Sequence, residues 1–380
     1  MMKRYLMAPG PTPIPVEALL AMSKPILHHR AAEYEQIFSE VRQGLKFLFQ
    51  TSTEVLVFAS SGTGAMEGAV VNTLSPGDKV LVVRGGKFGE RWGEICQAYG
   101  VNFEAIDVEW GNPADPALIE AVLKRDPSIK AVFVTHSETS TGTLSDLKTI
   151  AEVVSRTPAL LIADVVTSLG VTDVPVDAWK IDVAAAGSQK GLMLPPGLAF
   201  CSVSDKAWEM VAKSKLPKFY FNFTAEKQNI EKNQNAWTPA VSLLMALRET
   251  LALIQQEGLA NVFARHDRLA RATRAGVTAL GLELYSKAPT PAVTAVKAPA
   301  GIDGGQIVKT LRTKHGITIA GGQSHLKGKI FRISHMGYVD TYDIVTAISA
   351  LEMTLAGLGY PVELGKGVRA AEAVLMEGKA

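Results

Sequence analysis

Short apolar runs alternate with helical patterns from residue 31 to residue 203. Most of the runs are continuously apolar, which is typical of strands buried on both faces of a sheet. Strands that alternate with helices predict a mainly parallel sheet, covered by helices and joined by right-handed crossovers. We therefore expect an α/β fold in which a large domain holds a seven-stranded sheet. The predicted strands are residues 55–59, 80–83, 103–108, 131–135, 159–163, 183–186 and 198–203.

Helical periodicity fills most of the segments between these strands. Residues 31–50 place Ile37, Val41, Leu45 and Leu48 on one face at three- and four-residue spacing. The other helices predicted in this half are residues 64–74, 89–99, 116–124 and 147–156.

The pattern changes after Pro217. Residues 217–239 are polar and aromatic without a clear period, so we expect a long loop there. Strong helical patterns follow on either side of Gly258, over residues 240–257 and 259–280. The remaining elements predict a small α+β domain, with strands over 282–285, 292–297, 317–320 and 330–334, helices over 304–315 and 341–356, and a helical tail over 362–380.

Three parts are therefore expected along the chain. Residues 1–25 contain five prolines, which exclude a continuous helix or a central strand and predict an extended N-terminal arm. Residues 26–258 form the predicted large domain, which includes the loop 217–239. Residues 259–380 form the predicted small C-terminal domain.

Composition narrows the classes of function. Of the 380 residues, 47% are hydrophobic and 20% are charged, and the formal charge is +2. A net charge this small does not indicate binding to nucleic acid or to an anionic membrane. No apolar run is long enough for a membrane-spanning helix, and the seven histidines lack metal-ligand spacing, so we expect no metal. The two cysteines cannot form a disulfide framework, which favours a reducing compartment such as the cytoplasm.

The stretch from Ile181 to Phe200 carries the most informative chemistry. An apolar strand runs into Gly187-Ser188-Gln189-Lys190, and a Pro-Pro-Gly break precedes the next strand. Lys190 lies just past the carboxyl end of a buried strand, where open α/β sheets bind ligands. Burial there lowers the pKa of an amine and makes it a nucleophile. When Lys190 is considered alone, the alternative interpretation is an ordinary solvated lysine on the surface.

A second strand end changes that balance. The strand over residues 159–163 runs into Asp164, on what should be the same edge of the sheet. A lysine and a carboxylate held at adjacent strand ends indicate a site for pyridoxal phosphate, whose aldehyde needs an amine and whose ring nitrogen needs a carboxylate.

Two further strand ends are polar. Residues 55–59 lead into Ser60-Ser61-Gly62-Thr63-Gly64 at the start of a helix, a turn suited to a phosphate. Its spacing matches neither the dinucleotide fingerprint nor the Walker motif, and ordinary helix capping by Ser61 and Thr63 is the alternative. Residues 131–135 lead into a hydroxyl-rich segment that contains Thr139. Four polar strand ends together predict one crevice.

These motifs occur in the order expected for a known family. The sequence resembles the class V, fold-type I pyridoxal-phosphate aminotransferases, in the alanine–glyoxylate and serine–glyoxylate (serine–pyruvate) branch. The resemblance covers nearly the whole chain, and the segments that carry it are PGPT at 9–12, SSGTGAMEGA at 60–69, THSETSTG at 135–142, LIADVVTSLG at 161–170, GSQKG at 187–191 with PPG at 195–197, and FRIS at 331–334.

The resemblance implies a role for each matching residue. Lys190 resembles the lysine that forms the Schiff base with the cofactor, and Asp164 resembles the carboxylate that pairs with the pyridinium nitrogen. Val166 and Phe88 resemble the residues on the two faces of the ring, with phenylalanine where an aromatic residue, often tryptophan, is usual. The remaining implied cofactor contacts are Ser61, Gly62, Thr63, Thr139 and Gln189.

Two more matches concern the substrate and a second subunit. Arg332 resembles the arginine that holds the substrate α-carboxylate, and a guanidinium fork suits a carboxylate through two parallel hydrogen bonds. Thr238 resembles a threonine that reaches the cofactor phosphate of the other subunit, so the resemblance implies a homodimer with shared sites in which the loop 217–239 lies at the interface.

The implied reaction moves an amino group from alanine or serine to glyoxylate or pyruvate. A cysteine desulfurase is one alternative on the same fold, but the segment 321–328 before Arg332 lacks the cysteine which that chemistry requires. Another class V lyase, or a different amino donor, also remains open. A further alternative is a non-catalytic protein, since some chains that resemble this branch carry a historical hydrogenase-subunit label. The two isolated cysteines cannot hold the metal cluster that hydrogen chemistry needs.

Overall fold

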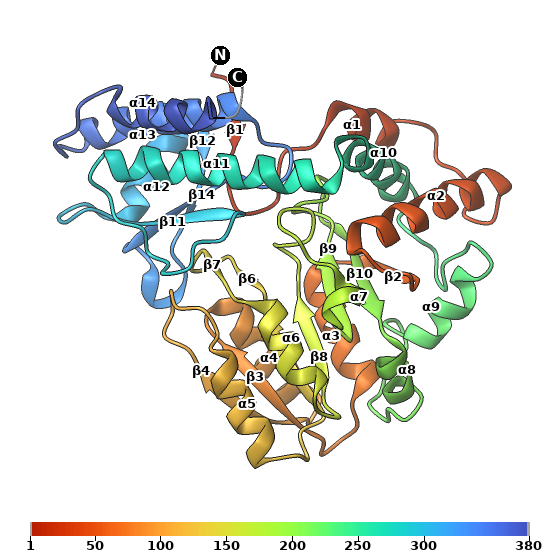
Figure 1. Cartoon of the computed structure of the whole chain (residues 1–380). Coiled ribbons are helices and arrows are strands. Elements are labelled where there is room, and N and C mark those ends of the chain that lie inside the picture. The colour runs from red at the N-terminus through yellow and green to blue at the C-terminus, as the bar shows by residue number, and fades with distance from the viewer. Residues whose placement is uncertain (1, 378–380) are drawn as a thin grey trace.

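The large sheet confirms the fold class predicted from the pattern. The computed structural model describes residues 2–377, and within them a seven-stranded sheet has the order β2-β10-β9-β8-β5-β3-β4 (Figure 1). Every neighbouring pair is parallel except at β10, which runs antiparallel to both β2 and β9. The strands are β2 (Val55–Ser60), β3 (Lys79–Arg84), β4 (Asn102–Asp107), β5 (Ala131–Thr135), β8 (Leu160–Asp164), β9 (Val183–Gly187) and β10 (Gly197–Val203).

The apolar character of these strands follows their place in the sheet. All residues of β5, β8 and β9, in the middle of the sheet, are buried, whereas the edge strand β4 is mostly half-buried. Helix α3 is almost entirely buried and packs on β9 and β10, which explains its apolar composition on every side. The helices of this part are α2 (Ala32–Phe49), α3 (Gly62–Thr73), α4 (Lys87–Ala98), α5 (Pro116–Arg125), α6 (Leu147–Ser155), α7 (Val176–Trp179), α8 (Asp205–Val211) and α10 (Val241–Glu257), and a short hairpin joins β6 (Ser137–Glu138) to β7 (Thr143–Leu144).

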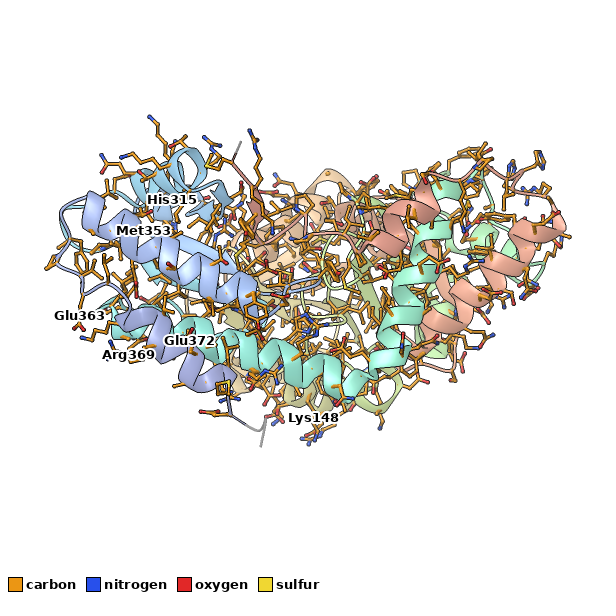
Figure 2. All side chains as sticks on the ribbon, turned by 90° about the horizontal axis from the view of Figure 1, so that it is seen from above. Lys148, His315, Met353, Glu363, Arg369 and Glu372 are labelled. Carbon is orange, nitrogen blue, oxygen red and sulfur yellow. The ribbon has the colours of Figure 1, made fainter. Side chains whose placement is uncertain are left out.

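The C-terminal part has its own small sheet and its own core. Its three strands are antiparallel in the order β11-β14-β13, and its buried cluster is separate from that of the large sheet. Figure 2 shows α11 running from the α10 side of the molecule to α14, the helix that carries Arg369 and Glu372. The elements are α11 (Leu259–Ala279), β11 (Val293–Lys297), α12 (Gly304–Lys314), β12 (Ile317–Thr318), β13 (Ala320–Gly321), a 3-10 turn η1 (Ser324–Leu326), β14 (Ile330–Ser334), α13 (Thr341–Gly357) and α14 (Lys366–Leu375).

The structure corrects two predicted strands of this part. Residues 282–285 form no regular strand, and only Leu284 makes an isolated bridge, to Val296. The single strand predicted over 317–320 is divided. Its first half, β12, pairs with β1 (Tyr5–Leu6), whereas β13 pairs with β14. A short apolar pattern does not reveal that the chain passes from one sheet to another within four residues. Of the predicted tail over 362–380, α14 is helical and residues 378–380 lie outside the described residues.

Two predictions of irregular structure are also wrong in part. The loop predicted over 217–239 contains helix α9 (Phe223–Ile230), whose N-cap residue Asn222 accepts a hydrogen bond from the Ala225 N–H at 3.1 Å. The arm predicted over 1–25 contains helix α1 (Val16–Met22), which begins directly after Pro15. The boundaries predicted at residues 25 and 258 stay predictions.

Within residues 2–377, no helix combines the length and the apolar character needed to cross a membrane.

Candidate active site

Lys190 and Asp164 lie at the carboxyl ends of neighbouring strands. Asp164 is the last residue of β8 and is paired in register with Ala185 of β9, and Lys190 follows the end of β9. Both side chains are buried, with exposed fractions of 4% for Asp164 and 8% for Lys190. The sheet therefore brings the predicted pair to one buried edge, as the strand pattern indicates.

Burial dominates the electrostatics of this pair. It raises the pKa of Asp164 to about 7, and the Val166 N–H and the charges of Arg91 and Lys190 oppose the rise, while Glu138 adds to it. Burial also lowers the pKa of Lys190 to about 8, with Asp164 opposing the change and Arg332 adding to it. The lysine is therefore partly unprotonated near neutral pH.

The N-terminal arm covers the lysine, a contact that the sequence does not predict. The Lys190 ammonium donates to the carbonyl oxygen of Pro9. Thr12 donates from its hydroxyl to the carbonyl oxygen of Lys190 at 3.0 Å and from its N–H to that of Gln189 at 3.2 Å. Gly10, at a φ of 109°, passes so close to the lysine side chain that a β-carbon there would overlap it. The arm thus belongs to the site.

The turn from β2 into α3 has the form expected of an anion site. Ser61 is the N-cap residue of α3, yet its side chain makes no capping hydrogen bond within the described chain. Thr63, in the first turn, accepts a hydrogen bond from the Arg91 guanidinium at 3.2 Å. Gly62 lies against Val166, and a β-carbon on Gly62 would come within 2.7 Å of it. The alternative of capping by the Ser61 side chain therefore finds no support in the geometry, and the positive end of α3 stays free for an anion.

Phe88 and Thr139 approach the same edge from β3 and β5. Phe88 is half-buried in the first turn of α4, and the Arg91 guanidinium lies 4.7 Å from its ring centroid. Thr139 is buried at 2% exposure in the turn after β5. Glu138, its neighbour, accepts hydrogen bonds from the N–H groups of Phe88 and Gly89, each at 3.0 Å. Arg91 and Glu138 are thus site neighbours that the sequence analysis missed.

Val166 and Gln189 flank the buried pair. The Val166 N–H donates to Oδ1 of Asp164 at 2.9 Å, which fixes the carboxylate plane. Oε1 of Gln189 is buried and finds no hydrogen-bond partner among the described residues. A buried acceptor without a partner indicates a place for a ligand donor.

Arg332 reaches this edge from the small sheet. It lies in the central strand β14, is 6% exposed, and donates from Nη1 to the carbonyl oxygen of Thr139 at 2.7 Å. Its Nε and Nη2 donate to the carbonyl oxygen of Gly321 at 3.0 and 2.8 Å. Burial lowers its pKa to about 10, and Glu138 opposes that change. A guanidinium has five N–H groups, so one on each terminal nitrogen is left for a carboxylate.

Thr238 stands apart from this group. It is exposed, and it lines a small cavity with Ala59 and Leu198, next to the end of β2. Within residues 2–377 no hydrogen bond joins it to Lys190 or Asp164.

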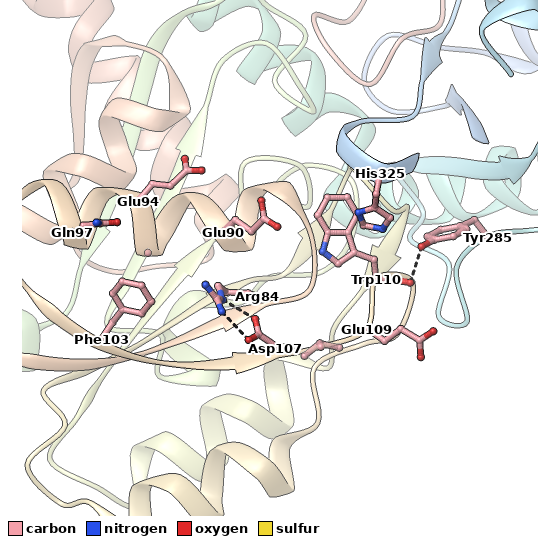
Figure 3. A pocket seen from close by; sticks show the side chains of 12 residues that line it. Arg84, Glu90, Glu94, Gln97, Phe103, Asp107, Glu109, Trp110, Tyr285 and His325 are labelled. Carbon is pink, nitrogen blue, oxygen red and sulfur yellow. Dashed lines mark hydrogen bonds and ion pairs between the residues drawn. The ribbon is translucent and has the colours of Figure 1, made fainter. Parts of the chain in front are cut away.

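A larger groove lies beside the site, at the outer edge of the sheet. Its volume is about 570 Å³. Figure 3 shows Trp110 of the large part against His325 of η1, with their ring centroids 4.4 Å apart and their ring planes tilted by 52°. The Tyr285 hydroxyl donates to the Trp110 carbonyl oxygen at 2.9 Å, and Arg84 forms an ion pair with Asp107. The contact between Trp110 and His325 joins the segment that follows Gly321 to the large part.

A family model described as aminotransferase class V matches residues 4–345. The chain belongs to this family. A relative from Synechococcus sp. that is named a soluble hydrogenase small subunit is 50% identical over 98% of this chain and 98% of its own. The L-aspartate–glyoxylate aminotransferase of Paracoccus denitrificans is 38% identical over 96% of this chain and 94% of its own. The ureidoglycine–glyoxylate aminotransferase of Bacillus subtilis superposes with a TM-score of 0.94 at 33% identity, over 99% and 98% of the two chains.

Membership of the class V aminotransferases makes pyridoxal phosphate the cofactor, and the residues present fit it. The aldehyde needs an amine, and Lys190 is buried with a lowered pKa. The phosphate needs N–H donors at a helix start, and the first turn of α3 is free of side-chain caps. Asp164 uses Oδ1 for Val166 and leaves Oδ2 for a ring nitrogen, and the unpartnered Gln189 Oε1 lies beside Lys190 in the chain.

Proposed function

We propose that the chain is a pyridoxal-phosphate-dependent aminotransferase that moves the amino group of alanine or serine to glyoxylate or pyruvate. The observation that carries the proposal is the convergence of Lys190, Asp164 and Arg332. All three side chains are buried at the same edge of the large sheet. The charges of Asp164 and Arg332 both affect the pKa of Lys190. Relatives named for glyoxylate as an acceptor support the choice of a small 2-oxo acid.

Lys190 is the proposed attachment point of the cofactor and the group that moves the proton. The pKa of about 8 leaves part of the amine unprotonated near neutral pH, so the amine could accept the proton of the substrate α-carbon and would then deliver it to the cofactor carbon. The bound cofactor supplies the electron sink that stabilises the carbanion left behind. The arm over Pro9 and Thr12 keeps water away from this amine.

Asp164 and Arg332 set the orientation of the reacting groups. Asp164, fixed by the Val166 N–H, holds a proton at the ring nitrogen through Oδ2. Arg332 presents one free N–H on each terminal nitrogen, which binds the substrate α-carboxylate and places the α-carbon toward Lys190. The proposed cofactor contacts of the same chain are Ser61, Gly62, Thr63, Phe88, Thr139, Val166 and Gln189.

We also propose a homodimer in which Thr238 serves the neighbouring subunit. Thr238 is exposed, and it follows residues whose side chains are tied down: Trp237 donates from Nε1 to the Tyr220 carbonyl oxygen at 3.0 Å, and Asn235 donates to Glu226 at 2.9 Å. A loop held by these hydrogen bonds, with an exposed hydroxyl at its end, suits a contact in trans. The two buried cysteines accord with a cytoplasmic enzyme.

Borohydride reduction followed by peptide mass mapping tests the proposal. Purified protein supplied with pyridoxal phosphate should turn yellow and bleach on reduction, with the pyridoxyl group fixed on Lys190. Alanine, serine and aspartate are then compared as donors to glyoxylate, pyruvate and 2-oxoglutarate. A protein that takes up no cofactor, or that carries the label on another lysine, would overturn the proposal.

The hydrogenase name of the Synechococcus relative makes one alternative worth measuring. Iron and nickel in stoichiometric amounts in the purified protein would contradict the aminotransferase proposal. Desulfurase or lyase activity is checked in the same series, with L-cysteine as the substrate and sulfide as the product.

A further inference from the structure

Helix α4, which carries Phe88, begins without a cap of its own. Its N-cap residue is Gly86, which has no side chain to accept hydrogen bonds from the first turn. The acceptors come instead from the turn after β5. Glu138 Oε2 accepts from the N–H groups of Phe88 and Gly89, each at 3.0 Å, and the Ser140 hydroxyl accepts from the Lys87 N–H at 3.0 Å.

The same carboxylate also accepts hydrogen bonds within its own turn. Oε1 of Glu138 accepts from the N–H of Ser140 at 3.0 Å and from its hydroxyl at 2.5 Å. Thr139 lies between these two residues, and its carbonyl oxygen is the acceptor for Arg332 at 2.7 Å. The side chain of Glu138 is 5% exposed. One buried carboxylate therefore ties Phe88 on α4 to the turn that holds Thr139 and receives Arg332.

A close approach of two backbones makes this bridge possible. A β-carbon on Gly86 would overlap the Glu138 carboxylate, so only glycine fits at that position. Every group bonded to Glu138 is a donor, and an ionised carboxylate is the side chain that accepts on both oxygens. A glutamine would turn an NH₂ group toward two of these donors.

We propose that Glu138 is a positioning residue that holds Phe88 against the cofactor ring and, through the Thr139 carbonyl, holds Arg332 in place for the substrate. It touches neither ligand itself. The inference rests on the proposed function, because it assigns Phe88 to the ring face and Arg332 to the substrate carboxylate. It goes further by joining the two contacts through one buried group, so that a change at Glu138 disturbs both.

The test compares E138Q with the wild type in the full-length protein. We expect the dissociation constant for pyridoxal phosphate to rise at least tenfold, the visible circular dichroism of the bound cofactor to fall, and KM for the amino donor to rise at saturating cofactor. D115N is the matched control: Asp115 caps α5 by accepting from the Ala117 N–H at 2.8 Å, away from the site. Asparagine can still accept this hydrogen bond, so D115N should leave the cofactor affinity and the visible circular dichroism unchanged.

E138D provides a second measurement if E138Q does not fold. It keeps the charge but is one methylene shorter, so it cannot bond α4 and Ser140 together, and we expect the same loss of visible circular dichroism. Variants that lose only thermal stability, with wild-type cofactor affinity and dichroism, would make Glu138 a simple helix cap and overturn the inference. A wild-type protein that binds no pyridoxal phosphate would instead overturn the proposed function.

Discussion

The guanidinium of Arg332 donates from Nη1 to the carbonyl oxygen of Thr139 at 2.7 Å, across 193 positions of the chain. This bond joins the small sheet to the turn after β5. Together with the bonds to Gly321, it orients the guanidinium plane before any substrate is bound. A preorganised fork binds a carboxylate at a lower entropic cost than a mobile one.

R332K should therefore damage substrate binding although it keeps the positive charge. An ammonium cannot bond Gly321 and Thr139 and also offer two parallel N–H groups to a carboxylate. A loss of about 3 kcal/mol corresponds to a rise of about a hundredfold in KM for the amino donor. Titration with pyridoxal phosphate should give the wild-type affinity.

R271K serves as the control for an arginine-to-lysine change, since Arg271 lies exposed on α11 and pairs with Asp267. It should keep the wild-type KM. Equal losses of substrate and cofactor affinity in R332K would show that Arg332 does not bind the substrate carboxylate.

The raised pKa of Asp164 predicts an unusual pH dependence for the cofactor-free protein. Its folded-state pKa is about 7, against an ordinary value of 3.8 for an aspartate, so the unfolded state releases this proton first as the pH rises. The free energy of unfolding therefore falls as the pH rises from about 4 to 7, and the full destabilisation by the buried charge is present above pH 7. D164N removes the buried charge. We expect it to raise the melting temperature of the cofactor-free protein at pH 8, to raise it less at pH 5, and to change it little below pH 4.

D182N is a suitable comparison, because Asp182 is also buried but accepts hydrogen bonds from Ser204 and the Leu161 N–H. It should lower the melting temperature at pH 8. A D164N protein that is less stable than the wild type at pH 8 would show that the Asp164 charge is already compensated in the empty site. D164N should also lose transaminase activity, which is measured separately.

The sequence predicted the sheet and its edge because both depend on local patterns. Continuous apolar runs identify buried strands, and parallel strands bring their carboxyl ends to one edge, so Lys190 and Asp164 could be placed together in advance. The arm around Thr12 was expected to border the site, but its partner could not be identified. Its contact with Lys190 joins residues 178 positions apart, and the periodicity of apolar residues does not predict such distant contacts.

Helix α9 and the role of Glu138 were missed for different reasons. Phe223–Ile230 is short and polar, so its period is weak, and its one local signal is the capping residue Asn222. Glu138 caps helix α4 by accepting from the N–H of Phe88, which lies 50 positions earlier in the chain. Capping motifs are recognised within a few residues of the helix they serve, so a distant cap needs the folded structure to be seen.

The aromatic pair Trp110 and His325 predicts a second way to weaken substrate binding. The pair holds the segment between β13 and β14 against the large part (Figure 3), and Gly321, the last residue of β13 before that segment, orients Arg332. W110A should raise KM for the amino donor several-fold, since an aromatic pair contributes about 1 kcal/mol beyond its buried area. The absorbance of the bound cofactor should stay the same.

Y285F is the control for the same groove, because it removes only the hydrogen bond to the Trp110 carbonyl oxygen. We expect a KM close to that of the wild type. If W110A leaves KM unchanged, the pair of Trp110 and His325 does not support the arginine.

Mixed dimers test whether Thr238 acts in trans. A K190A subunit supplies an intact Thr238, and a T238A subunit supplies an intact Lys190, so a mixed dimer with shared sites contains one complete site. Random mixing in equal amounts then restores about a quarter of the wild-type activity, measured at a cofactor concentration that leaves the T238A dimer largely empty. K190A mixed with R332A is the control. Arg332 bonds Thr139 of its own chain, so these two lesions lie in different sites of the mixed dimer and neither site is complete. Activity in the T238A mixture no higher than the mean of its two parents would place Thr238 outside the neighbouring site.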